Sequence, residues 1–179
     1  MRPKKEVLNF EKFKRAIHYV IWKAGNRANF GATKLNKVLW FTDAGMYVLH
    51  QHSMTGATYV REKHGPVPKP FVPAREALKK AGTIEVWKDG KLTRFRTKSN
   101  PDMTEFSSEE MRLLDHWIEV IDKEHTAESI SEKTHDYGWE IAIEGEEIPL
   151  IAILAERVRQ PNEEEIAWAH DRMKKRGLG

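Results

Sequence analysis

The chain of 179 residues contains no cysteine. This absence excludes disulfide bonds, thiolate catalysis and cysteine-ligated zinc, and it fits a reducing compartment. No apolar run approaches the roughly 18 residues that a membrane-spanning helix needs, and the charged first residues do not resemble a secretory signal. We therefore expect a cytoplasmic protein that does not span a membrane.

Motifs for catalysis are missing as well. The sequence has no phosphate-binding G-x-x-x-x-G-K-[ST], no G-x-S-x-G nucleophile turn and no zinc-binding H-E-x-x-H. Eight histidines are present, but His50 and His52 are predicted not to face each other, because helix positions two apart diverge. We therefore expect no enzymatic activity, no bound metal and no cofactor.

Charge is unevenly distributed, although the formal net charge is only +3. Residues 1–37 carry ten Lys and Arg against two Glu, whereas residues 105–165 carry eighteen acidic residues against five basic ones. Such an asymmetry can steer a charged partner toward one half of the protein. The alternative is that the two halves form solvated faces that partly neutralise each other.

The stretch from Thr33 to Gln51 is predicted to be the central helix of the fold. Its apolar residues lie nearly all round the helix, with Leu39 and Leu49 on one arc, and helices of this kind are usually buried. Thr33 is predicted to be the N-cap. The length of the chain suits a single domain over residues 1–179.

A small antiparallel sheet is expected to accompany the helices. Two strands flank Asp89-Gly90, which is a strong signal for a hairpin with a type I′ turn. The segment Gly65–Pro68 is predicted to be a stiff turn, because proline cannot donate to a sheet ladder. Further helices are predicted over residues 7–23, 70–81, 107–123, 126–134 and 163–175. The fold class is therefore α+β, mostly helical, around a buried central helix.

Three short motifs occur in a fixed order along the chain. They are KLNKVLWFTD on the central helix, MTGATYVREKHGPVP after it, and Thr-His-x-x-x-Trp further on. Together they resemble the Panacea domain, the antitoxin domain of the SocA/GepA type. The matching positions that we single out are Lys34, Lys37, Asp43, Thr55, Gly56, Tyr59, Gly65, Pro66, His135 and Trp139. The resemblance covers about residues 10–140 and leaves residues 141–179 as a C-terminal helical extension.

The resemblance implies a function in protein binding. Members of the family are expected to neutralise a cognate protein toxin by direct contact, with different members matching unrelated toxins. A hetero-oligomer with the toxin is therefore expected. In this chain the acidic second half could meet a basic surface of the toxin.

Five residues are candidates for toxin contact. Lys37 could make a charge-assisted bond to the partner, or it could only extend from a buried helix to water. The final helix carries Glu163, Glu164 and Glu165, together with Trp168, and an aromatic side chain ringed by charge is typical of an interface hot spot. The alternative is that Trp168 packs on the core and the acids only begin a helix.

His135 is predicted to be a structural residue. It belongs to the Thr-His-x-x-x-Trp element, and buried polar groups are normally paired. We therefore favour a histidine that is hydrogen-bonded under the central helix over a functional one.

A DNA-binding regulator of the winged-helix type is the alternative function. The predicted hairpin strands are basic, which favours a nucleic-acid partner. The basic positions are Lys88, Lys91, Arg94, Arg96 and Lys98. The acidic block in the second half works against a polyanionic partner, so nucleic acid is a possible partner but not the favoured one.

Overall fold

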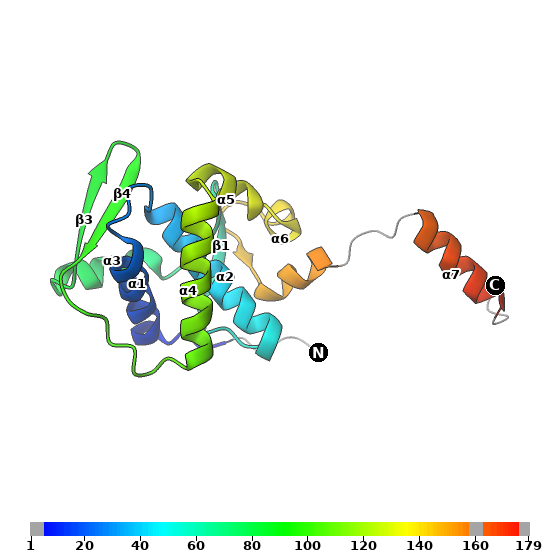
Figure 1. The fold of residues 1–179 in the computed structure, drawn as a ribbon, viewed down its shortest axis with the longest axis horizontal. Coiled ribbons are helices and arrows are strands. Elements are labelled where there is room, and N and C mark those ends of the chain that lie inside the picture. Colours follow the sequence, from blue (N-terminus) through cyan, green and yellow to red (C-terminus); the bar gives the residue numbers. More distant parts are fainter. Residues whose placement is uncertain (1–5, 158–162, 176–179) are drawn as a thin grey trace.

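The fold is built around α2 (Ala32–His50), as the sequence predicts. The computed structural model describes residues 6–157 and 163–175. α2 runs through the middle of the molecule and packs against α1 (Phe10–Ala24), α4 (Ser108–Glu124) and α5 (Ala127–Lys133) (Figure 1). The remaining helices are α3 (Phe71–Lys80), α6 (Tyr137–Ile141), the 3-10 helix η1 (Leu150–Arg157) and α7 (Glu163–Lys175).

Burial explains why α2 is central. Eleven of its nineteen residues are buried, and Leu35, Val38 and Leu39 have no exposed surface at all. Two details of the prediction are wrong. The N-cap position is Gly31, with no side-chain cap, so Thr33 lies inside the helix. Leu49 is 56% exposed, because the last turn of α2 extends beyond the core.

The first sheet is antiparallel and has the order β2-β1-β5. It consists of β1 (Tyr59–Glu62), β2 (Gly65–Pro68) and the two-residue β5 (Glu147–Ile148). The segment Gly65–Pro68 is therefore a strand, and its prediction as a turn is wrong.

The register explains why the prolines of β2 are tolerated. Pro66 pairs with Arg61, but the amide of Arg61 donates to Glu146 on the other side of β1. Arg61 and Pro66 are therefore a pair without hydrogen bonds between them, and the ladder needs no amide from Pro66. An edge strand accepts proline at such a position.

The second sheet is the predicted hairpin, formed by β3 (Ile84–Asp89) and β4 (Leu92–Thr97). Its turn differs from the prediction. Asp89 pairs with Leu92, so the loop residues are Gly90 and Lys91, and only Gly90 has a positive φ (57°). A glycine at the first loop position is typical of a type II′ turn, not of type I′.

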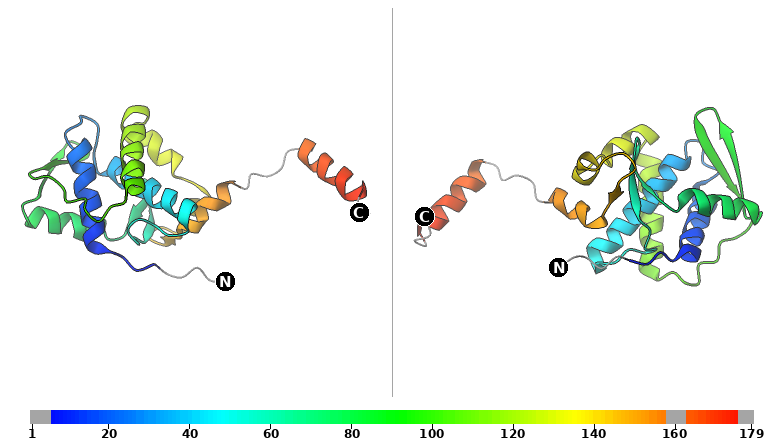
Figure 2. Two further views of the ribbon diagram at one scale, coloured as in Figure 1. Left: turned by 60° about the horizontal axis from the view of Figure 1, so that its bottom comes forward. Right: turned by 180° about the vertical axis from the view of Figure 1, so that it is seen from behind.

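The helix caps agree with the sequence. Ser107 and Glu110 form the predicted capping box at the start of α4, and Thr126 caps α5. Seen from behind, β5 lies beside β1, and η1 packs against α2 and α6 (Figure 2). The α+β, mostly helical fold class is confirmed. Within the described ranges, no helix has both the length and the apolar character to cross a bilayer.

Candidate functional site

Asp43 on α2 is the centre of a buried hydrogen-bond network. Its Oδ1 accepts the backbone amides of Met54 at 2.8 Å and Thr55 at 3.2 Å. Its Oδ2 accepts the hydroxyls of Thr55 at 3.0 Å and Tyr59 at 2.7 Å. One carboxylate therefore fixes the segment that enters β1 onto the central helix.

Burial and hydrogen bonding oppose each other at this carboxylate. Asp43 is completely buried, and the loss of hydration raises its pKa to about 6, while the donors of Tyr59, Thr55 and Met54 act in the opposite direction. Burial also raises the pKa of Tyr59 well above its usual value, and the charge of Asp43 adds to this effect. The Tyr59 ring packs edge-on against Trp40, with centroids 4.9 Å apart.

Gly56 belongs to the same region. It has a φ of 70°, and a Cβ there would lie 2.8 Å from the carbonyl carbon of Val7. The amide of Asn9 donates to the carbonyl oxygen of Thr55 at 2.9 Å. The residues resembling the Thr-Gly-x-x-Tyr motif thus hold residues 7–9 as well as β1.

Lys37 forms a second buried site on α2. Only 1% of the residue is exposed, and its Nζ donates to the carbonyl oxygen of Pro66 at 2.9 Å. Gly65 has a φ of 92°, and a Cβ there would lie 2.6 Å from Nζ and in collision with the Thr134 hydroxyl. The Gly-Pro-Val motif therefore gives the lysine both its space and its hydrogen-bond acceptor.

The structure excludes the interpretation that Lys37 reaches water. Burial lowers the pKa of its amine to about 7, and the charge of Asp136 opposes this shift. In the described conformation the side chain also has no surface to offer a partner. Lys34, one turn earlier, is 2% exposed, and its Nζ lies 3.3 Å from the carbonyl oxygen of Asp122.

His135 and Trp139 stack face to face beside this site. Their ring centroids are 3.7 Å apart, and the guanidinium of Arg61 lies 4.1 Å from the centre of the Trp139 ring. The indole Nε1 of Trp139 donates to the carbonyl oxygen of Glu62 at 2.9 Å. Arg61 was not among the predicted residues, although it lies two positions after Tyr59 on the same strand.

His135 is held mainly by stacking. Its Nε2 is buried and has no hydrogen-bond partner within residues 6–157 and 163–175. Burial lowers the pKa of the imidazole, the charges of Lys37 and Arg61 lower it further, and a hydrogen bond with the backbone of Lys63 opposes them. Its neighbour Asp136 caps α6 by accepting the amide of Trp139 at 2.9 Å.

One prediction about the other histidines is wrong. His50 and His52 stack with centroids 5.6 Å apart. α2 ends at His50, and Gln51 adopts a left-handed conformation that turns His52 back toward it. Over the described residues, no group of three or more potential ligands is placed to hold a metal ion.

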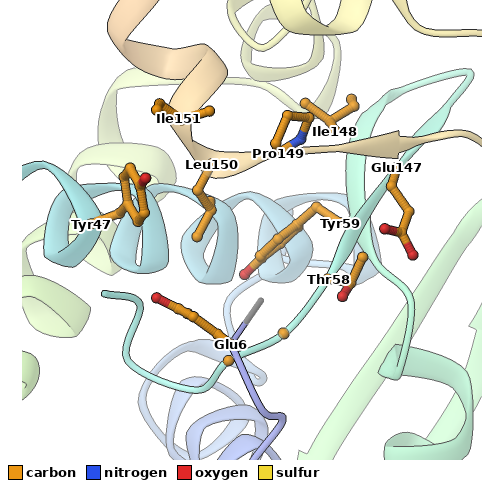
Figure 3. A pocket seen from close by; sticks show the side chains of 11 residues that line it. Glu6, Tyr47, Thr58, Tyr59, Glu147, Ile148, Pro149, Leu150 and Ile151 are labelled. Carbon is orange, nitrogen blue, oxygen red and sulfur yellow. The ribbon is translucent and has the colours of Figure 1, made fainter. Parts of the chain in front are cut away.

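An open groove of about 390 Å³ lies where α2, the entry to β1 and the segment after β5 meet. Figure 3 shows Tyr47, Leu150 and Glu6 around this opening. Its lining is mostly apolar, with Glu6 and Glu147 as the two acids. Ile151, which also lines the groove, is 44% exposed. The carboxylate of Glu6 is held by Ser53, whose amide donates to it at 2.8 Å.

The remaining predicted contact residues lie on α7, whose existence and bounds are confirmed. Glu163 is exposed. The side chains of Glu164, Glu165 and Trp168 lie outside the described part of the chain. The hypothesis that they contact a toxin therefore stays a prediction.

These features describe a small, mostly helical α+β domain with a motif-rich interior and an open apolar groove. Residues 35–140 match the family model described as "Antitoxin SocA-like, Panacea domain". This match spans more than half of the chain, and the protein belongs to that family. The comparisons with curated proteins and with solved structures found no match.

Proposed function

We propose that the protein is an antitoxin that neutralises a cognate protein toxin by direct binding, in the cytoplasm and without catalysis. The family match over residues 35–140 carries this proposal. A hetero-oligomer with the toxin is the active form.

The motif residues support the view that buried residues maintain the fold and exposed residues contact the toxin. Lys37, Asp43, Thr55 and Tyr59 are each at most 2% exposed. Asp43, Thr55 and Tyr59 hold β1 to α2, and Lys37 holds β2 to the same helix, so they serve the shared fold. Contact with the toxin then falls to exposed side chains outside this set.

The groove beside Tyr47 is the best candidate for that contact. One wall comes from the matched stretch, through Tyr47 and residues 56–59, and the other comes from residues 147–151, which follow it. A partner seated there would touch both a family segment and a segment outside the match. Such an arrangement suits a family whose members select different toxins.

The chemistry of the groove indicates the kind of toxin segment it would accept. Ile148, Pro149, Leu150 and Ile151 offer an apolar wall, and burial of apolar surface is the main driving force for association. Glu147 is an acid at the rim whose carboxylate is half exposed, and the amine of Lys69, 3.8 Å away, offsets only part of its charge. We propose an apolar segment of the toxin with a basic residue beside it, and a second contact with the acids of α7.

Co-expression with the neighbouring open reading frame tests the function. We expect the antitoxin to restore growth and to co-purify with the toxin. Ile151→Glu places a charge in the groove and should abolish both effects. Val72→Glu is the matched control, because Val72 is 54% exposed on α3 and does not line the groove. Equal rescue by both variants would place the interface elsewhere.

The contribution of α7 is tested separately. Trp168→Ala and the triple Glu→Lys change at 163–165 should each weaken binding, and circular dichroism should show both variants folded. Wild-type affinity in both would remove α7 from the interface.

A further inference from the structure

The hairpin β3–β4 and the last turn of α3 form a surface that lies outside the groove and helix proposed above for toxin contact. We call it the basic hairpin face. A cleft of about 550 Å³ lies on it, between Lys79 of α3 and the hairpin residues Trp87, Arg96 and Lys98. Figure 1 shows the hairpin at the far side of the body from α6.

Trp87 is the exposed aromatic residue of this face. It pairs with Arg94 across the hairpin, so both side chains lie on one side of the sheet. The guanidinium of Arg94 lies 5.9 Å from the ring centre of Trp87, and that of Arg96 lies 6.0 Å from it. The neighbouring Phe95 is fully buried, whereas Trp87 is 40% exposed. The hairpin therefore uses one side for the core and exposes the indole on the other, beside the exposed Arg96. The side chain of Arg94 is only 13% exposed, because it pairs with Asp89 and donates to the carbonyl oxygens of Arg27 and Ala28.

The basic hairpin face is strongly positive. Residues 71–98 carry eight Lys and Arg against three acids. One of these acids, Glu85, forms ion pairs with both Arg96 and Lys98. Lys79, Lys80 and Lys91 are exposed and have no carboxylate within ion-pair distance in the described ranges. These lysines are free to meet an external anion.

The acids of α4 are paired with cations of α1 and of the loop after it. Asp115 binds Lys23, and Glu119 binds Arg27. Asp122 also binds Arg27, at 2.8 Å. Arg27 lies next to the hairpin, because its carbonyl oxygen accepts from the guanidinium of Arg94 at 3.2 Å. These acids are therefore engaged in ion pairs, and none of them lines the cleft beside Trp87.

We propose that the basic hairpin face binds a short segment of single-stranded nucleic acid. One base stacks on Trp87, and the lysines of α3 and the hairpin contact the phosphates on either side. Aromatic platforms inside positively charged grooves are the usual means by which proteins hold single strands without reading sequence. The exposed indole favours a nucleic acid over an acidic peptide, because a peptide of that charge brings no flat ring to stack on it.

Fluorescence anisotropy with a labelled 12-nucleotide oligothymidine tests this proposal on the full chain. The logarithm of the association constant should fall linearly with the logarithm of the salt concentration. The slope should be about −2 to −3 for three to four phosphate contacts. Trp87→Ala should weaken binding about tenfold, within the range measured for loss of one stacked base. Trp22→Ala is the matched control, because Trp22 is 43% exposed and does not line the cleft beside Trp87. It should leave the affinity unchanged.

A pair of charge-reversal variants tests the contribution of the lysines to phosphate binding separately from base stacking on Trp87. Lys79→Glu with Lys91→Glu should abolish binding, whereas Lys63→Glu with Lys133→Glu makes the same change in net charge elsewhere and should have little effect. Absence of binding by the wild type would overturn the proposal. Equal affinities of the Trp87 and Trp22 variants would also overturn it. Equal binding of a polyglutamate peptide with the same number of charges would assign the surface to acidic proteins instead.

Discussion

Two buried charges on α2, Asp43 and Lys37, are satisfied to very different degrees. Asp43 accepts four hydrogen bonds, two from backbone amides and two from hydroxyls. Lys37 has three donors, and within residues 6–157 and 163–175 its Nζ makes one hydrogen bond, to the carbonyl oxygen of Pro66. Both are almost without exposed surface.

The difference shows two ways of using a buried charge. The network at Asp43 is closed, since each carboxylate oxygen has two donors, and it ties β1 to the helix. The site at Lys37 is only partly satisfied, and its charge acts on His135, whose Nε2 has no hydrogen-bond partner among the described residues. A buried charge with its partners in place specifies the structure, whereas one with few partners destabilises it. We therefore expect substitutions at the two positions to act in opposite directions.

Asp43→Ala should produce the largest loss. It leaves four donors without an acceptor, and breaking a buried charged network typically costs about 3–5 kcal/mol. Urea denaturation followed by circular dichroism would measure the change in free energy of unfolding. Thr55→Val, which removes one hydroxyl donor, should cost about 1 kcal/mol. A loss below that value for Asp43→Ala would mean that the network does not hold β1 to α2.

Leu39→Ala tests the helix between the two charges. Leu39 has no exposed surface, and truncation of a buried leucine costs about 2–5 kcal/mol. The same denaturation experiment applies. If the loss were under 1 kcal/mol, α2 would not be the centre of the core.

Lys37→Met should stabilise the protein. Replacing a poorly satisfied buried charge by an apolar side chain of similar length often gains about 1–4 kcal/mol. The pKa of Lys37 is lowered to about 7 in the folded state. The buried lysine therefore destabilises the protein fully below pH 7, and this effect disappears as the pH rises toward the ordinary pKa of a lysine. The advantage of Met over Lys should therefore be largest at pH 6 and shrink between pH 7 and 10.

The unfolding free energies of both proteins at pH 6, 8 and 10 measure this dependence. An advantage that stays constant with pH would show that Lys37 does not titrate in the folded protein. A destabilised Met variant would mean that the hydrogen bond to Pro66 outweighs the cost of burial.

The smallest expected effect is on His135. The charge of Lys37 contributes to the lowered pKa of this imidazole. Lys37→Met should therefore raise the pKa of His135, which an NMR titration of the histidine side chains would detect. An unchanged pKa of His135 would show that the charge of Lys37 does not act on the imidazole.

Local patterns in the sequence predicted much of this fold. The all-round apolar character of residues 33–51 gave α2, and Ser107 with Glu110 gave the start of α4. The Asp-Gly signal placed the hairpin correctly but not its turn type, because the pairing of Asp89 with Leu92 depends on the whole ladder.

Features that depend on distant segments were not predictable in this way. Gly65–Pro68 can form a strand because Arg61 directs its hydrogen bonds toward residues 145–146 and not toward Pro66. The sequence of the segment does not reveal this. The stacking of His50 on His52 depends on the left-handed Gln51. The groove joins residues 47, 56–59 and 147–151, and no local pattern relates these segments. The motif predicted which residues belong to the Asp43 and Lys37 sites. It did not predict that Asp43 has four hydrogen-bond partners whereas Lys37 has few.

The central claim is that the motif residues build the interior while an exposed groove recognises the toxin. Isothermal titration calorimetry between the purified protein and the product of the neighbouring open reading frame tests this most directly, with Ile151→Glu and Val72→Glu compared after both are shown to be folded. The account predicts stoichiometric binding that Ile151→Glu weakens at least about tenfold, a loss of about 1.4 kcal/mol, and that Val72→Glu leaves unchanged. Unaltered binding by Ile151→Glu, or no binding by the wild type, would contradict it.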